Sequence, residues 1–104
     1  MAKVLVMYNP PADPAAFDRY YFGTHVPLAR RIPKVRGVKF NSGAVSALSG
    51  NAPYLICEIE FDSMADLQAA LQSPEGQTTA ADVANFAQAG VTILICDTRP
   101  DAPA

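Results

Sequence analysis

This chain of 104 residues has few of the residue types that mark a well-known kind of site. It contains one histidine and two cysteines, and its formal charge is only −2. The positive charges form no long run, and the densest cluster comprises Arg30, Arg31, Lys34 and Arg36. Such a cluster near a helix end more often offsets the helix dipole than binds nucleic acid. We therefore expect no nucleic-acid partner.

Long apolar runs are also missing. No segment approaches the ~20 residues that span a bilayer. The first residues lack the length and the small-residue cleavage site of a signal peptide. No Gly-rich phosphate loop, Walker lysine or Rossmann fingerprint occurs. We therefore expect no membrane partner and a cytoplasmic location.

The chain does contain enough apolar residues for one core. Half of it is hydrophobic, and its length lies within the usual range of a single domain. We expect one domain over residues 1–98. Residues 99–104 are expected to form a proline-containing tail.

Apolar periodicity predicts four strands, at residues 3–8, 38–45, 54–61 and 91–98. Helical regions are predicted after the cap residues Asp13, Ser63 and Ser73, and Gly90 is predicted to end the last of them.

Pro27 interrupts the first helical region. Because proline removes a backbone hydrogen bond and clashes with the preceding turn, we expect a break or kink between Gly23 and Val26. A second short helical piece is expected over residues 27–32.

The order β-α-β-β-α-β is that of the ferredoxin-like α+β fold, an antiparallel four-stranded sheet with both helical regions on one face. Alternation in the third strand predicts that Leu55, Cys57, Ile59 and Phe61 pack under the helices. The bare face then carries Tyr54, Ile56, Glu58 and Glu60. Because that face is too apolar to stay exposed, we predict a homodimer.

The two cysteines lie on the third and fourth strands. In the expected strand order 4-1-3-2, the first strand separates Cys57 from Cys96 by ~10 Å, beyond the ~7 Å that a disulfide allows. We expect both to be free, small core residues. With one histidine and no closely spaced ligand set, we expect no metal site and no cofactor, the alternative being haem held by His25 alone.

The segment 17–28 is the most informative, because the only histidine, His25, follows an aromatic cluster there. Histidine is the side chain whose ordinary pKa lies nearest neutrality. Tyr21, four residues earlier, would neighbour it on a helix, and Asp18 is a candidate to orient the ring. Two interpretations stay open. Either His25 and Tyr21 form a proton relay, or His25 caps a carbonyl freed by Pro27 while the tyrosines fill the core.

Other acidic residues suggest no site. Glu58 and Glu60 are interpreted as solvent or interface charges, and Glu75 and Asp82 as helix-start and surface charges.

Several motifs resemble the ethyl tert-butyl ether degradation (EthD) family. The first is Phe17-x-x-Tyr20-Tyr21-x-x-x-His25-x-Pro27-Leu28, followed by Pro33-x-Val35. The similarity continues in residues 54–63, 73–76 and 82–86, and so covers nearly the whole chain. The resemblance implies a dimeric α+β barrel, with a cavity between helices and sheet in each subunit.

We predict His25 and Tyr21 as the catalytic residues. The predicted substrate-binding residues are Phe17, Tyr20, Tyr21, His25 and Leu28.

The resemblance leaves the reaction open, because the wider superfamily includes cofactor-free oxygenases, isomerases, polyketide cyclases and haem-binding enzymes. One hypothesis is a cofactor-free oxidoreductase, isomerase or cyclase of a degradation or secondary-metabolite pathway. It would act on a hydrophobic carbonyl, lactone or phenolic compound by His-assisted proton transfer. The alternative is a non-catalytic module that binds an apolar metabolite or assists a partner oxygenase. A pocket with a second polar group near His25 favours the enzyme, and a fully packed core favours the module.

Overall fold

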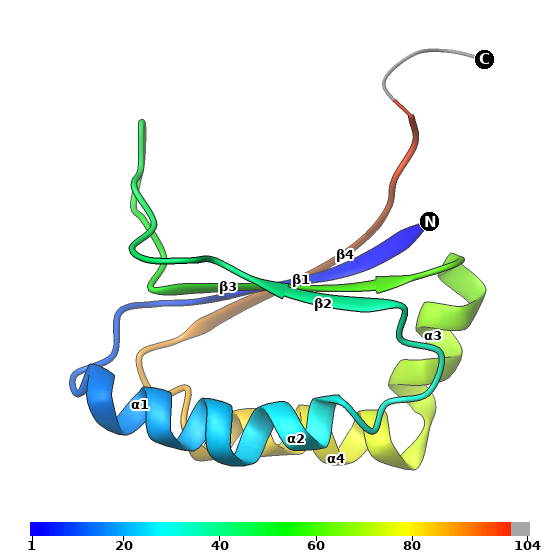
Figure 1. Ribbon diagram of the computed structural model, residues 1–104, viewed down its shortest axis with the longest axis horizontal. Helices are drawn as coiled ribbons and strands as arrows, with labels where there is room; N and C mark the ends of the chain where they lie inside the picture. Colours follow the sequence, from blue (N-terminus) through cyan, green and yellow to red (C-terminus); the bar gives the residue numbers. More distant parts are fainter. Residues whose placement is uncertain (101–104) are drawn as a thin grey trace.

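The computed structural model describes residues 1–100 and has the ferredoxin-like α+β fold (Figure 1). Four antiparallel strands form one sheet in the order β2-β3-β1-β4, as predicted. The strands are β1 (Ala2–Tyr8), β2 (Gly37–Phe40), β3 (Leu55–Phe61) and β4 (Val91–Asp97).

The helices lie on one side of the sheet (Figure 1). They are α1 (Pro14–Tyr20), α2 (Val26–Ala29), α3 (Met64–Gln72) and α4 (Pro74–Asp82). A 3₁₀ turn, Val83–Asn85, follows α4. None of the helices in residues 1–100 has the length and apolar character needed to cross a membrane.

The predicted cap residues begin the helices. Asp13 accepts a hydrogen bond from the amide of Ala16 at 3.1 Å, and a proline follows it at the first helical position. Ser63 and Ser73 accept from the amides three residues later, at 3.1 and 3.0 Å. Gly90 adopts φ +106° between the last helical turn and β4, a conformation that favours glycine. Local sequence therefore determines where these elements start.

Of the break or kink expected near Pro27, the structure shows that there is no break. Instead of a break, residues Tyr21–His25 form a π-helical turn that joins α1 directly to α2. The amide of Val26 donates to the carbonyl of Tyr21, five residues back. In a regular α-helix the Pro27 ring would clash with the carbonyl four residues back. The wider turn accommodates the proline, so the helix continues.

The core lies between the helices and the two central strands. Leu55, Cys57, Ile59 and Phe61 are buried on the helix side of β3, as predicted. The alternate residues of β1 beside them are also buried, and α3 adds two residues that are fully covered, Leu67 and Ala70. Each large apolar side chain buried here contributes about 1.5–3 kcal/mol to the stability of the fold, relative to an exposed side chain.

The helix-free face of the sheet carries the predicted charges but not Tyr54. Glu58 and Glu60 pair with Lys3 and Lys39 at 2.9 and 3.0 Å.

The prediction for Tyr54 was wrong because β3 begins one residue later, so Tyr54 lies outside its alternation. Its ring packs on Phe17 with 5.4 Å between centroids, and its hydroxyl donates to Asp18 at 2.8 Å.

Strand β2 is shorter than predicted. It ends at Phe40, and the side chain of Asn41 then accepts a hydrogen bond from the amide of Ile56 at 2.8 Å. Residues 42–53 leave the sheet on the side opposite the helices (Figure 1).

Both cysteines are free, as predicted, and β1 lies between their strands. Cys57 is buried, but the prediction of a core position for Cys96 was wrong. Cys96 lies opposite Lys3 in the strand register, on the helix-free face of the edge strand β4. The chain itself does not cover it there.

We predict that a second copy covers the helix-free face. Leu94 is exposed there beside Leu5, its partner in the strand register. Light scattering at micromolar concentration should give twice the mass of one chain, and Leu94→Glu should give the mass of a monomer. Gln68→Glu, which adds the same charge on the exposed side of α3, should stay dimeric. A monomeric wild type would contradict the prediction.

Thiol titration should find two thiols per denatured chain. In the native protein Cys57 should not react, because burial raises the pKa of its thiol and blocks access. Cys96→Ser should therefore yield one thiol, and only after denaturation. A native Cys96→Ser protein that reacts at once would show that the core around Cys57 is open.

Candidate functional site

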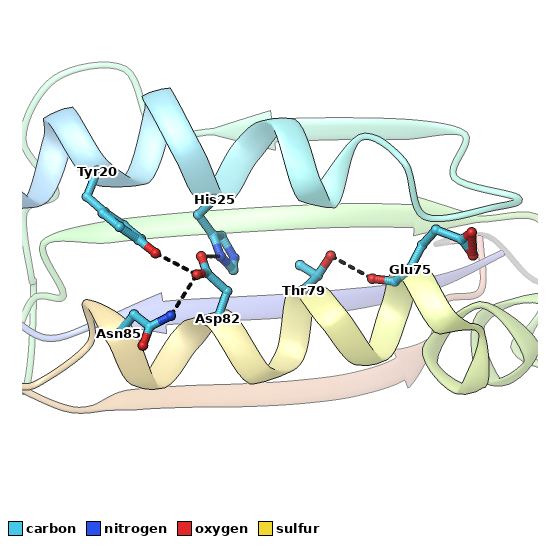
Figure 2. A network of polar contacts seen from close by, with 6 residues as sticks. All are labelled: Tyr20, His25, Glu75, Thr79, Asp82 and Asn85. Carbon is cyan, nitrogen blue, oxygen red and sulfur yellow. Dashed lines mark hydrogen bonds and ion pairs between the residues drawn. The ribbon is translucent and has the colours of Figure 1, made fainter.

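A buried carboxylate connects the two helical regions. Asp82, the last residue of α4, lies opposite Tyr20 and His25, and the three side chains point toward one another (Figure 2). His25 Nδ1 is 2.9 Å from Asp82 Oδ2. The Tyr20 hydroxyl donates to Asp82 Oδ1 at 2.6 Å, and Asn85 Nδ2 donates to the same oxygen at 3.0 Å.

Local structure places each member of this network. The π-helical turn carries His25 on the inner side of the first helical region, where only 5% of the residue is exposed. Asp82 is 8% exposed, and one turn earlier Thr79 is also buried. The Thr79 hydroxyl donates to the carbonyl of Glu75 at 2.8 Å, so it does not compete for Asp82 (Figure 2).

The network favours an ionised Asp82. Burial alone would raise the pKa of this carboxyl, but hydrogen bonds from Tyr20, Asn85 and His25 outweigh it and hold the pKa below its ordinary value. The same bond to Asp82 raises the pKa of Tyr20. At neutral pH the pair is therefore a phenol that donates to a carboxylate.

A cavity of about 100 Å³ lies between the helices and the sheet beside this network. His25, Tyr21 and Thr79 are in its wall, together with mainly apolar residues such as Val6, Val26 and Phe40. A cavity of ~150 Å³ is enough to hold benzene. This space therefore suits a group no larger than a single ring.

The predicted pair of Tyr21 and His25 is in contact, but by stacking. Their ring centroids are 5.4 Å apart with 28° between the planes. Burial is the main cause that raises the pKa of Tyr21, and the neighbouring Cys57 and Tyr8 raise it further, so Tyr21 stays a neutral phenol. Phe86 covers the imidazole from another direction, at 4.7 Å between centroids.

The other predicted substrate-binding residues lie elsewhere. Phe17 stacks on Tyr21, at 5.6 Å between centroids, and with Tyr20 it lines an open groove of about 470 Å³ on the outer side of the network. Asn85 and Phe86 complete that side of the groove. Leu28 lines a separate hollow beside Arg31 and Pro74, away from His25.

Three of the sequence interpretations were wrong. Asp82 is not a surface charge but the partner of His25, and Asp18, the expected partner, accepts from Tyr54 instead. The partner of the His25 Nδ1 is also a carboxylate, not a carbonyl freed by Pro27.

The sequence did contain a signal for Asp82. Thr79, Asp82, Val83 and Phe86 are spaced i, i+3, i+4 and i+7, so Asp82 lies on the same helix face as apolar residues.

The described residues show no arrangement suited to a metal. Within residues 1–100, no three histidine, cysteine or acidic side chains lie close enough together to hold one. The cavity beside His25 is also smaller than the ~300–1,000 Å³ of typical ligand and cofactor pockets.

The free energy of unfolding should depend on Asp82 below neutral pH. Because the folded pKa is lowered, the ionised carboxylate stabilises the fold above its ordinary pKa of about 3.9. That contribution disappears as the pH falls through the lower folded value. Tyr20→Phe removes one donor, so it should lower the unfolding free energy at pH 7 more than at pH 3.

Urea unfolding at both pH values measures this difference. Tyr54→Phe is the matched control, since it removes a hydroxyl that donates to a different aspartate, Asp18. If Tyr20→Phe lowers the unfolding free energy equally at the two pH values, the hydrogen bond of Tyr20 does not depend on the charge of Asp82.

Comparison with known proteins shows where this chain belongs. The EthD domain model matches residues 9–90. An uncharacterized 11.0 kDa protein from the thcB-thcC intergenic region of Rhodococcus erythropolis is 48% identical over 105 residues, which cover 99% of this chain and all of that protein.

Solved structures also resemble this chain. The EthD family protein of Bacillus halodurans has a TM-score of 0.85 and 35% identity, over 95% of this chain and 99% of that one. SnoaB, a cofactor-independent oxygenase from Streptomyces nogalater, has a TM-score of 0.64 and 13% identity over 99% and 97%, which is a likeness of fold alone. The chain is a member of the EthD family.

Proposed function

We propose that this protein is a small cofactor-free enzyme in which His25 moves a proton of a small apolar substrate. The substrate class is a single-ring carbonyl, lactone or phenolic compound of a degradation or secondary-metabolite pathway. Oxygenase, isomerase and cyclase chemistry all include such a step.

One observation carries the proposal. His25 is buried in the wall of an apolar cavity, and its Nδ1 already has a partner in Asp82. Its other ring nitrogen, Nε2, is therefore the one available to a ligand. An imidazole held in this way is a suitable general base or acid, because a low-polarity surrounding strengthens its interaction with a reacting group.

The step itself is simple. Nε2 takes a proton from a carbon next to a carbonyl, or from a phenol, and the substrate becomes an enolate or phenolate. The imidazolium that forms is stabilised by the carboxylate of Asp82 at 2.9 Å. The proton returns from Nε2 to another atom of the substrate. In an oxygenase the carbanion instead forms a C–O bond with O₂, and the resulting peroxide anion takes the proton from Nε2 to give a hydroperoxide.

The likeness to SnoaB supports the choice of a cofactor-free reaction by analogy of fold. The size of the cavity supports a small substrate, since about 100 Å³ admits a group no larger than a single ring.

A second candidate is a non-catalytic module that binds an apolar metabolite or assists a partner oxygenase. The close packing of Tyr21 and Phe86 against His25 favours it, because such packing covers part of the ring from a ligand.

Exchange of carbon-bound hydrogen in D₂O tests the enzymatic proposal without knowledge of the full reaction. The protein should accelerate exchange next to the carbonyl of small cyclic ketones or lactones, and His25→Ala should reduce that rate by about 10²–10⁴-fold. Asp18→Asn is the control, because Asp18 bonds Tyr54 and does not contact His25.

Thermal melts with the same compounds separate the two candidates. If His25 takes part in binding, His25→Ala should reduce the ligand-induced rise in melting temperature. A variant that melts several degrees lower, keeps the full ligand-induced rise and has the wild-type exchange rate would contradict catalysis and support the module.

A further inference from the structure

The hydrogen bonds around Asp82 are distributed unequally between its two oxygens. Oδ1 accepts from two donors, the Tyr20 hydroxyl at 2.6 Å and Asn85 Nδ2 at 3.0 Å. Oδ2 faces only His25 Nδ1, at 2.9 Å. Tyr20 is half-buried and Asn85 is exposed, so the carboxylate is held from the outer side and directed toward the imidazole on the inner side.

This arrangement decides which nitrogen carries the proton in neutral His25. An ionised carboxylate can only accept hydrogen bonds. Since Tyr20 and Asn85 both donate to it, Nδ1 must also donate at the third contact, because an acceptor facing an acceptor would be repelled.

We propose that Asp82, held by Tyr20 and Asn85, is a positioning residue that keeps the proton of neutral His25 on Nδ1 and leaves Nε2 as the base. This inference rests on the proposed function and deepens it, since it assigns roles to three residues that act through His25.

The aromatic neighbours provide the second constraint. Tyr21 stacks on the imidazole at 5.4 Å between centroids, and Phe86 lies against it at 4.7 Å. The ring therefore has little freedom to turn over and exchange its two nitrogens. Asp82 fixes the tautomer, and the aromatic rings fix the orientation.

Asp82→Asn provides a sharp test because the new amide has two different ends. Its oxygen is expected to face Tyr20 and Asn85, which are two donors, so its NH₂ group must face His25. An NH₂ group can only donate, so Nδ1 would become the acceptor and the proton would move to Nε2. The substitution should therefore reverse the tautomer while preserving the shape of the side chain.

The experiment is ¹H–¹⁵N NMR of the ring nitrogens at alkaline pH, with the imidazole neutral. Assignment is direct, since His25 is the only histidine. Wild type should show a protonated Nδ1 and a bare Nε2, and Asp82→Asn should show the reverse. Asp18→Asn, which alters a matched tyrosine–aspartate pair with Tyr54, should resemble wild type.

Two results would overturn the inference: a wild type protonated at Nε2, or a folded Asp82→Asn protein that keeps its proton on Nδ1. If Asp82→Asn does not fold, the Tyr20→Phe variant provides the test instead. Losing one donor on Oδ1 leaves more charge on Oδ2, so the proton on Nδ1 should resonate further downfield. An unchanged resonance would then overturn the inference.

The test does not measure turnover, so the two proposals can fail separately. A reversed tautomer in Asp82→Asn without any hydrogen exchange in wild type would support the role of Asp82 and contradict the enzyme. Hydrogen exchange that requires His25, together with an unchanged tautomer in Asp82→Asn, would support the enzyme and contradict the role of Asp82.

Discussion

The arrangement of the helical layer depends on one buried charge, the carboxylate of Asp82. A charge so largely covered by protein is costly unless several donors surround it. The donors come from both helical regions, and the residues joined by these bonds are 57 and 62 positions apart in the sequence. Apolar packing alone tolerates small shifts of a helix over a sheet. Hydrogen bonds require defined distances and angles, so they set how the first helical region lies against α4.

Much of the fold follows from local sequence patterns. Asp13 and the proline after it begin α1, and strict alternation places the even and odd residues of Leu55–Phe61 on opposite faces. The strand order follows from the sequence of elements, because split βαβ units have right-handed crossovers. These features depend on rules that act over a few residues or on general topology, so the sequence was sufficient to predict them.

The remaining features depend on contacts that no local rule determines. The sequence placed His25 near aromatic residues and offered Asp18 as its partner. The carboxylate that contacts His25 comes instead from α4, which only the packing of the helices brings near. Tyr54 was assigned to the wrong face because the alternation of β3 begins at Leu55 and does not extend back to it. Pro27 excluded a regular α-helix correctly, but a break and a π-helical turn both satisfy that constraint.

The π-helical turn has a consequence for how this chain can vary. Gly23 and Thr24 are exposed, and a Cβ atom at Gly23 would meet nothing within 4 Å, so side-chain replacements there are sterically open. Loss of a residue is different. With one residue fewer, the turn would close as a regular α-helix and bring the Pro27 ring against the carbonyl four residues before it, the clash that the wider turn avoids. Among homologues, these two surface positions should differ freely in residue type while the length of the segment stays constant.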